Sequence, residues 1–356
     1  MTRCIFCLEE KEPLTDEHII PAALGSNVVL KKSVCEDCQR QCNRSFEQRF
    51  LKGSNFIALL RAHLGIRGRR NTPIFGFDQH GHPLTLVVQP GFPPIRVGLR
   101  ENGLERPMQV IVADESRNPL DYYFLPDKIQ RPILPSFFDG IVESVSPEAK
   151  FASFWADGDS IAANAWRELL EAFVAWSNLR TLIPIASSVA AREAQVPFSL
   201  DWNTEYRNRG LAKICFLYLI SMLPYSDRFN EAFQSIRDYI LFGKNTAEMQ
   251  TLELVIQWNG PHPEVALGDR NFTYLLATVE VDRRVFGVVQ LHNMGLFCVR
   301  LLASQPNTCP PDSLTTYLLQ KEGSDNYALT THDHSSDEVA AFAASIRRNG
   351  QLSMKV

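Results

Sequence analysis

The sequence lacks several features that identify common classes of protein. It has no run of about 18 apolar residues, the minimum for a helix that crosses a membrane. Glycine-rich phosphate loops of the Walker and dinucleotide-binding types are absent, so nothing indicates a nucleotide-driven motor or a dinucleotide-dependent redox enzyme. No segment of about 20–50 residues is repeated, so a repeat architecture is not indicated either.

Length and composition allow a substantial folded protein. The chain has 356 residues, of which 45% are hydrophobic, enough for about two or three domains. Charge is unevenly distributed: residues 1–71 contain 12 Lys and Arg against 8 Asp and Glu, whereas the whole chain has a net charge of -4. A basic segment joined to an acidic body is the pattern expected of a phosphate-backbone binder attached to another domain.

Four of the eight cysteines form two C-x2-C pairs, Cys4 with Cys7 and Cys35 with Cys38. Two such pairs can supply four thiolates to one tetrahedral Zn²⁺. Disulfides are the alternative, but cysteines at this spacing are poor disulfide partners outside redox sites. A four-sulfur site has no open position, so we expect a structural zinc that stabilises a segment too short to build its own core.

Cysteine usage also indicates the cellular compartment. The zinc motif begins almost at once, with no visible signal peptide before it, and nothing else in the sequence is typical of a secreted protein. We therefore expect a cytoplasmic protein that does not associate with membranes. Among the other cysteines, Cys215, Cys298 and Cys309 are isolated and are expected to be core or surface thiols.

The candidate for chemistry between the cysteine pairs is His18. It follows the carboxylate Glu17 and precedes Ile19–Pro21, an apolar run that we expect to form a short buried strand with the imidazole at its end. With an unperturbed pKa near 6.5, a histidine can act as a general base at cellular pH. A hydrogen-bonded histidine beside a zinc fold is the alternative, although Glu17 and the zinc frame favour catalysis.

The second cysteine pair leads into a polar helix predicted over Glu36–Leu51. Its acidic residues Glu36 and Asp37 suit the positive N-terminal end of a helix. Gln39 and Asn43 are four residues apart and share one face, so both can present oxygen ligands in the same direction.

Cys4–Phe50 resembles the HNH endonucleases of the treble-clef, ββα-metal type. The motifs that carry this resemblance are C-I-F-C at Cys4–Cys7, E-H-I-I-P at Glu17–Pro21 and C-E-D-C at Cys35–Cys38. The resemblance implies a zinc knuckle and a hairpin packed on a helix, with His18 as general base and Glu17 as a ligand of a catalytic Mg²⁺ or Mn²⁺.

The resemblance further implies metal ligands on the helix at Gln39 and Asn43, with Gln39 at a position where the family usually has His or Asn. Downstream, Arg67, Arg69 and Arg70 lie among glycines next to this module. They are either a clamp on nucleic-acid phosphates or a solvated basic turn. The subgroup with the E-H-I-I-P motif has a similar arginine pair, which favours the clamp.

The rest of the chain is predicted to alternate between strand-rich and helix-rich segments. These are short strands over 72–124, a proline-rich connector over 126–147, an amphipathic helix over Ile161–Leu182, a helical hairpin over Asn208–Leu241, antiparallel strands over 251–302, and a polar tail that ends in a helix near Asp337–Arg348. Lys213 in the first hairpin helix is expected to extend to the surface. His332-Asp333-His334 and the histidines His80 and His82 are expected in solvated loops rather than metal sites.

Together these features predict an α+β protein with a zinc-stapled treble-clef module at residues 1–52. A basic helix and connector at 53–71 and an accessory α+β domain at 72–356, with a candidate division near 126–160, would follow. The predicted activity is metal-dependent hydrolysis of DNA phosphodiesters, with the accessory domain directing or regulating cleavage. Nucleic acid is the expected partner, together with a regulatory protein or a second copy of the chain. The alternative is an inactive zinc-stapled module that binds nucleic acid or protein.

Overall fold

The computed structural model describes most of both ends of the chain and parts of its middle. The described residues are 2–52, 55–66, 74–76, 84–86, 92–100, 103–124, 145–155, 179–182, 204–243, 255–257, 273–282, 284–292, 295–302, 312–322 and 326–353. Helices and strands are mixed, which confirms the α+β class. The chain forms two compact units, residues 1–60 with 202–356 and residues 61–201. The sequence-derived boundaries at 52 and 71 stay predictions.

The N-terminal segment forms a hairpin followed by a helix. Strands β1 (Leu14–His18) and β2 (Val29–Cys35) pair antiparallel, and α1 (Glu36–Cys42) begins directly after β2. The helix continues through one π-helical turn, η2 (Asn43–Glu47), into α2 (Gln48–Lys52). The predicted polar helix is therefore confirmed, with the π turn as an unpredicted feature.

The strand predicted after His18 is wrong. β1 ends at His18, and after one backbone bond from Ile19 to Val28 the chain bends into the short helix η1 (Ala22–Leu24). Ile19 and Ile20 are buried in this bend, so their hydrophobicity reflects core packing rather than strand pairing. Gly25 ends η1 at φ 78°, a left-handed conformation that glycine adopts without strain.

The second unit begins in α3 (Asn55–His63), which ends just before Gly65. Its short strands pair as β3-β6-β7, as β4-β5 and as a four-stranded sheet β11-β10-β8-β9, in agreement with the strands predicted over 72–124. The strand bounds are β3 Ile74–Phe75, β4 Thr85–Leu86, β5 Ile95–Arg96, β6 Gly98–Arg100, β7 Gly103–Glu105, β8 Gln109–Ala113, β9 Pro119–Phe124, β10 Phe151–Trp155 and β11 Arg180–Leu182.

The end of the helix predicted over Ile161–Leu182 is instead a strand, because the backbone of β11 pairs in parallel with β10. The helix prediction for residues 161–178 lies outside the described residues, as do 126–144 of the proline-rich connector and both His80 and His82.

The first unit contains a six-stranded antiparallel sheet in the order β12-β15-β14-β13-β16-β17. Its strands are β12 Val255–Gln257, β13 Tyr274–Val281, β14 Arg284–Leu291, β15 Leu296–Leu302, β16 Ser313–Glu322 and β17 Asn326–Asp333. The strands predicted over 251–302 are confirmed. The prediction of a polar tail is wrong for β16 and β17, because Leu314 and Tyr317 are buried and β16 pairs with β13.

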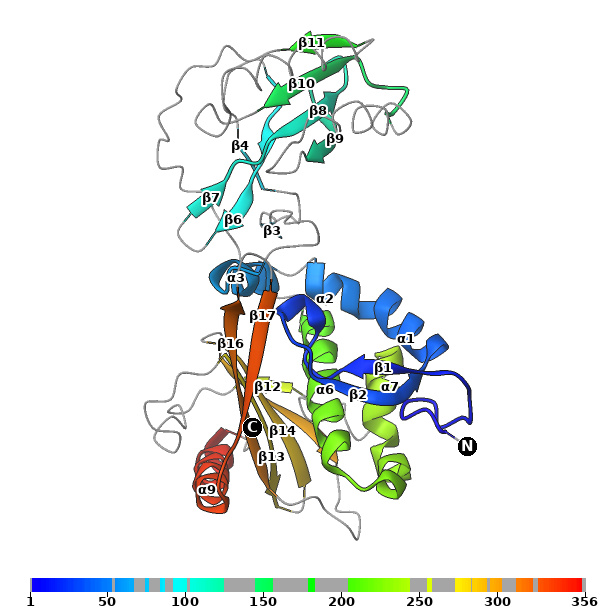
Figure 1. Ribbon diagram of the computed structural model, residues 1–356, viewed down its shortest axis with the longest axis vertical. Helices are drawn as coiled ribbons and strands as arrows, with labels where there is room; N and C mark the ends of the chain where they lie inside the picture. Colours follow the sequence, from blue (N-terminus) through cyan, green and yellow to red (C-terminus); the bar gives the residue numbers. More distant parts are fainter. Residues whose placement is uncertain are drawn as a thin grey trace. The chain divides into compact units, whose positions relative to one another are not determined.

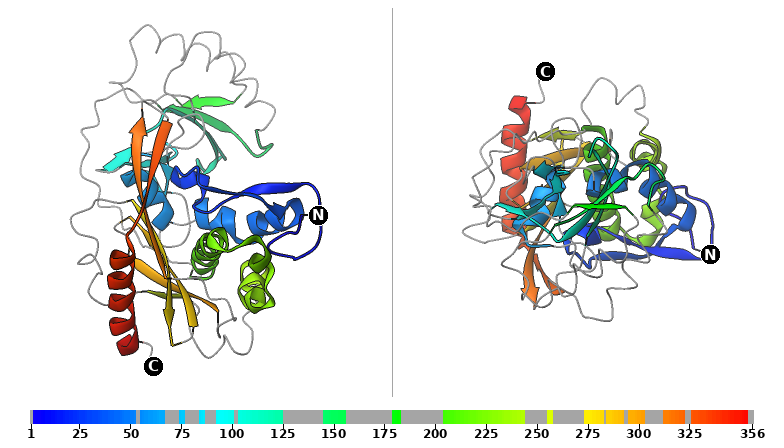
Figure 2. Two further views of the ribbon diagram at one scale, coloured as in Figure 1. Left: turned by 60° about the horizontal axis from the view of Figure 1, so that its bottom comes forward. Right: turned by 90° about the horizontal axis from the view of Figure 1, so that it is seen from above.

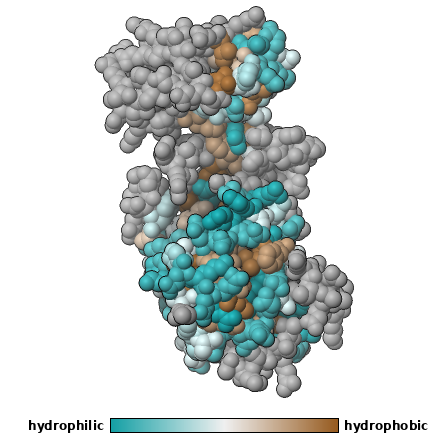
Figure 3. All heavy atoms as spheres, turned by 90° about the vertical axis from the view of Figure 1, so that its right-hand side faces the viewer, coloured by the Kyte–Doolittle hydropathy of each residue, from teal (hydrophilic) through white to brown (hydrophobic). Residues whose placement is uncertain are grey.

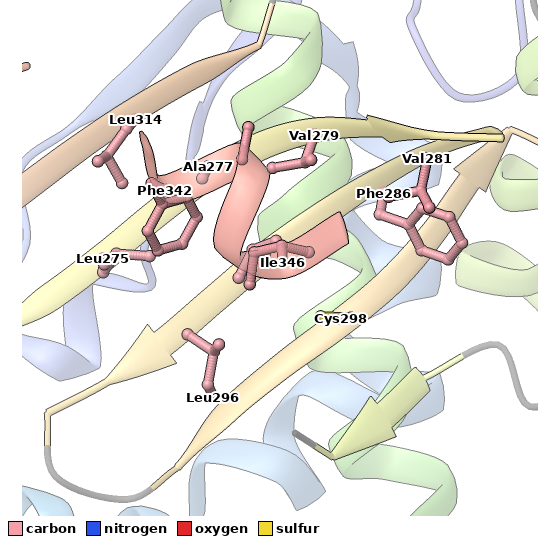
Figure 4. Packing of buried hydrophobic residues seen from close by; sticks show 12 residues of the cluster. Leu275, Ala277, Val279, Val281, Phe286, Leu296, Cys298, Leu314, Phe342 and Ile346 are labelled. Atoms are coloured by element: carbon pink, nitrogen blue, oxygen red, sulfur yellow. The ribbon is translucent and has the colours of Figure 1, made fainter. Parts of the chain in front are cut away.

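One face of this sheet packs against α9 (Ser336–Ser353), which confirms the predicted final helix and extends it. Alternate residues of β13, such as Leu275 and Ala277, point toward Phe342 and Ile346 of α9 (Figure 4). Every second residue of β13 faces α9, and residues three or four apart on α9 face β13, so the two elements bury their apolar sides against each other.

The other face packs against α6 (Thr204–Met222), which is followed by α7 (Gln234–Phe242) and confirms the predicted helical hairpin. A Cβ on Gly287 of β14 would lie 2.4 Å from the Cβ of Cys215, so the sheet and α6 approach closely. Figures 1 and 2 show α6 between the sheet and the N-terminal segment, with α9 on the far side of the sheet. Residues 209–220 of α6 are all buried because neighbours cover the helix on both sides.

Candidate functional site

The two cysteine pairs meet in one cluster. The sulfur atoms of Cys4, Cys7, Cys35 and Cys38 all lie within 4.8 Å of one another, and Cys7 and Cys35 Sγ are 3.8 Å apart. Four Zn–S bonds of about 2.3 Å in a tetrahedron would separate the sulfurs by about 3.8 Å. All four cysteines are free thiols, so the predicted cluster is confirmed and its geometry fits a structural zinc.

Local structure explains how the four sulfurs come together. Cys4 and Cys7 flank a tight turn, Cys35 ends β2 as the N-cap of α1, and Cys38 lies in the first turn of α1. The backbone N–H of Cys35 donates to the sulfur of Cys4 over 3.4 Å. Hydrogen bonds, led by the one from Cys38, lower the pKa of Cys4, which favours the thiolate that a metal binds.

Glu17 lies in the interior, contacted by a cation 196 residues further along the chain. Its side chain is 8% exposed, and its Oε1 is 2.8 Å from Nζ of Lys213 on α6. The same ammonium lies 2.5 Å from Oε1 of Glu47. The prediction that Lys213 reaches the surface is therefore wrong, because two buried carboxylates hold its ammonium in the interior.

The pKa values of this buried triad have competing causes. Burial lowers the pKa of Lys213, but the charges of Glu47 and Glu17 outweigh this effect, and the net direction is upward. Burial is the largest influence on Glu17 and raises its pKa, while Lys213 opposes that rise. Lys213 is thus charged at neutral pH.

Two buried polar atoms at the end of β1 have no hydrogen-bond partner among the described residues. They are Oε2 of Glu17 and Nδ1 of His18. A buried acceptor without a partner costs about 1–3 kcal/mol, so such atoms are rare unless a water, ion or ligand completes them. The carboxylate oxygen is a hard ligand of the kind that Mg²⁺ and Mn²⁺ take.

The helix residues predicted as ligands lie nearer the surface. Gln39 is half-buried and Asn43 is exposed. Their sharing of one ion with Glu17 stays a prediction, as does the role of Arg67, Arg69 and Arg70, which lie outside the described residues. The side chains of Lys31, Glu36, Asp37, Arg40 and Arg44 are also exposed, and the side of the unit that carries this segment is largely hydrophilic (Figure 3).

Sequence reasoning missed Glu47 and the true place of Lys213. Glu47 follows Asn43 by four residues and Gln39 by eight, so helical spacing alone places it on the same face. Lys213 could not have been found in this way, since it is 196 residues from Glu17 and meets it only through the packing of α6.

Buried arginines fix the N-terminal segment to α6 and α7. Arg237 of α7 is fully buried and donates to the carbonyl of Ile5, between the first two cysteines, over 2.7 Å. Arg209 of α6 donates to Oγ of Ser45 over 2.9 Å and to the carbonyls of Ile240 and Leu241. The four-cysteine segment and residues 204–243 therefore form one packed body.

A second group of metal-binding side chains lies at the end of β17. Ligand atoms of His332, His334 and Glu338 fall within 4.8 Å of one another. The predicted loop is wrong, because His332 is within a strand. His332 is exposed, as expected, whereas the side chain of His334 is 1% exposed. Glu338 also accepts hydrogen bonds from Ser335, a capping box that explains its position without an ion.

Residues 4–55 match the HNH endonuclease family. We call this matched segment, residues 4–55, the HNH module. It contains the four cysteines, Glu17, His18 and Glu47, whereas Lys213 lies beyond it. Comparison with curated proteins and with solved structures found no match. No helix within the described part of the chain is long and apolar enough to cross a membrane.

Proposed function

We propose that the protein is a metal-dependent endonuclease that hydrolyses DNA phosphodiesters at the HNH module. The observation that carries the proposal is the pairing of a family match with a buried, unpartnered carboxylate oxygen on Glu17, next in sequence to His18. A nuclease of this kind needs a base and a cation site side by side.

His18 is the proposed general base. Its imidazole takes the proton of a water molecule as that water attacks phosphorus and the bond from phosphorus to the leaving oxygen breaks. His18 is the last residue of β1 and directly follows Glu17 in the chain. Glu17 would hold a Mg²⁺ or Mn²⁺ ion, with Gln39 and Asn43 as further oxygen donors. Such an ion, when bound, neutralises charge on the phosphate and on the leaving oxygen.

The four-cysteine cluster has a separate, structural role in this proposal. A zinc ion with four sulfur ligands has no position for substrate, so it would hold the hairpin and α1 together as a treble clef. The tight attachment of Cys4–Cys7 to α7 through Arg237 supports a scaffold rather than a catalytic role.

The proposed partner is DNA, bound through backbone phosphates by Arg67, Arg69 and Arg70. Replacing all three should weaken binding and reduce its salt dependence by a slope of about 3, without changing sequence preference. The accessory parts of the chain would select the target or restrain cleavage, through a regulatory protein or a second copy. A cytoplasmic location belongs to the same proposal.

The direct test is nicking of supercoiled plasmid in Mg²⁺ or Mn²⁺. The His18→Ala variant should retain its zinc and lose about 100-fold or more of the activity, the usual contribution of a general base. His63→Ala, an exposed histidine outside the matched segment, is the matched control and should cut like the parent protein. Equal activity in the parent and His18→Ala, insensitive to EDTA, would rule the proposal out.

A second candidate is a zinc-stapled binding module without activity. The amide of Gln39 favours it, because a neutral oxygen ligand holds a hard cation more weakly than a charged ligand does. Salt-dependent retention on DNA without any nicking would select this alternative, whereas no retention would favour a protein-interaction module.

A further inference from the structure

Lys213 lies where two acidic side chains of the HNH module converge. Its ammonium contacts Glu17 from β1 and Glu47 from the π turn, at 2.8 and 2.5 Å. All three side chains are at most 14% exposed. Two carboxylates from separate elements that meet around one buried cation form the kind of oxygen cage that also binds divalent ions.

The position of Lys213 is set by the packing of α6 on α2. A Cβ on Gly210 would lie 2.6 Å from Cδ1 of Phe50, so the two helices touch at this pair. Lys213 follows Gly210 by three residues and Glu47 precedes Phe50 by three, so the next contact along the two helices is the ion pair itself. Close packing thus holds the ammonium between the carboxylates.

Charge in the triad is not balanced. Two carboxylates and one ammonium leave one negative charge in the interior, and Oε2 of Glu17 accepts no hydrogen bond among the described residues. Burying charged groups is costly, and apolar residues at positions 17, 47 and 213 together would avoid that cost, whereas removing Lys213 alone would leave two buried carboxylates without a counter-ion. The triad therefore carries a formal negative charge and an unpartnered carboxylate oxygen, both of which a divalent cation would satisfy.

We propose that Lys213 is an intramolecular counter-ion that competes with a divalent cation for Glu17 and Glu47. This inference rests on the proposed nuclease function and adds two residues to it: Glu47 as a member of the cation site, and Lys213 as the group that weakens cation binding. Because Lys213 belongs to α6, the fold of residues 202–356 controls how readily the HNH module takes its ion.

The test is Mn²⁺ binding to the full, zinc-loaded chain, measured by isothermal titration calorimetry. Glu17→Gln should abolish Mn²⁺ binding at this site, so the difference between this variant and the parent measures the site alone. Any Mn²⁺ binding elsewhere, for example at His332 and His334, is common to both proteins and cancels. Lys213→Gln removes the positive charge and keeps hydrogen-bond donors for the carboxylates. It should bind Mn²⁺ about tenfold more tightly or better, because repulsion by a nearby ammonium is lost. Unchanged or weaker binding would overturn the proposal.

A matched control lies one turn earlier on the same helix. Arg209→Gln also removes a buried cation, but Arg209 contacts Ser45 and backbone carbonyls rather than Glu17 or Glu47. It should lower stability and leave Mn²⁺ affinity unchanged. Thermal melting adds a second readout: Mn²⁺ should raise the melting temperature of Lys213→Gln more than that of the parent.

If Lys213→Gln does not fold, Glu47→Gln decides the matter. Without Glu47, the ammonium pairs with Glu17 alone, so Mn²⁺ binding should weaken, and unchanged binding would contradict the proposal. Failure of the nuclease function is distinguishable. Tighter Mn²⁺ binding by Lys213→Gln with no nicking by any variant would contradict the nuclease proposal and support the proposed role of Lys213 as a counter-ion. Nicking that depends on His18, with unaltered Mn²⁺ affinity in Lys213→Gln, would support the nuclease proposal and contradict the counter-ion role of Lys213.

Discussion

Replacing Arg237 with methionine tests how the four-cysteine segment is held. The guanidinium is fully buried and donates three hydrogen bonds to carbonyls, those of Ile5 at 2.7 Å, Arg228 at 2.8 Å and Asn230 at 2.9 Å. Methionine fills much of the volume but leaves these carbonyls without that donor. Each such bond to a charged donor contributes about 1.5–3 kcal/mol, while removing a buried charge recovers part of that sum.

We therefore expect Arg237→Met to lose about 3 kcal/mol of unfolding free energy. For a body of this size, that loss lowers the melting temperature by roughly 6–12 °C. Urea unfolding followed by circular dichroism, with zinc present, measures the loss. Zinc transfer to a chelating dye should also accelerate, because Ile5 lies between two of the predicted zinc ligands.

The matched control is Arg40→Met on the exposed face of α1. Arg40 forms surface pairs with Glu36, 3.3 Å away, and with Asp37, 4.0 Å away, and such pairs contribute about 0–1 kcal/mol each. If Arg237→Met unfolds and releases zinc like Arg40→Met, then the attachment of the segment through α7 is not as described.

Three other substitutions test the zinc site and the packing around it. Cys38→Ser should remove the bound zinc and unfold the hairpin with its helix; one zinc per chain by mass spectrometry under native conditions would contradict the four-sulfur site. Gly287→Ala should cost about 1–3 kcal/mol in urea unfolding, because its Cβ meets α6; stability equal to the parent would argue against that close approach. Tyr274→Phe should lower the unfolding free energy by about 1 kcal/mol, because the Tyr274 hydroxyl donates to the carbonyl of Leu24 in η1. Tyr225→Phe is the control, since Tyr225 is 55% exposed, and it should leave the unfolding free energy unchanged. Equal effects of the two substitutions would refute this hydrogen bond.

Sequence patterns identified the parts of the fold that depend on local spacing. Only two residues separate the cysteines of each pair, so the geometry of each pair is local. The pair that begins at Cys4 flanks a turn, and the pair that begins at Cys35 lies at the start of a helix. The helix from Glu36 and the hairpin of α6 and α7 follow from apolar periodicity. These features need no knowledge of distant contacts.

The unpredicted features arise from contacts between distant segments. Lys213 lies amid an apolar helix, where a lysine is expected to extend its ammonium to the surface, and only the packing of α6 against α2 brings it to Glu17. The apolar residues of β16 do not alternate with polar ones, because the buried Thr315 and Thr316 lie between Leu314 and Tyr317 and hydrogen-bond to side chains around the sheet. The bend after His18 follows from the backbone path into η1 rather than from hydrophobicity.

The central claim is that two kinds of metal have separate roles, a structural zinc at the cysteines and a catalytic divalent ion at Glu17. The most direct measurement is the rate of duplex DNA cleavage by protein that holds one zinc per chain, with and without added Mg²⁺ or Mn²⁺. We predict no cleavage with zinc alone and restored cleavage on addition of either ion, lost again in Glu17→Gln. Cleavage by the zinc-only protein, or cleavage by Glu17→Gln at the parent rate, would contradict the claim.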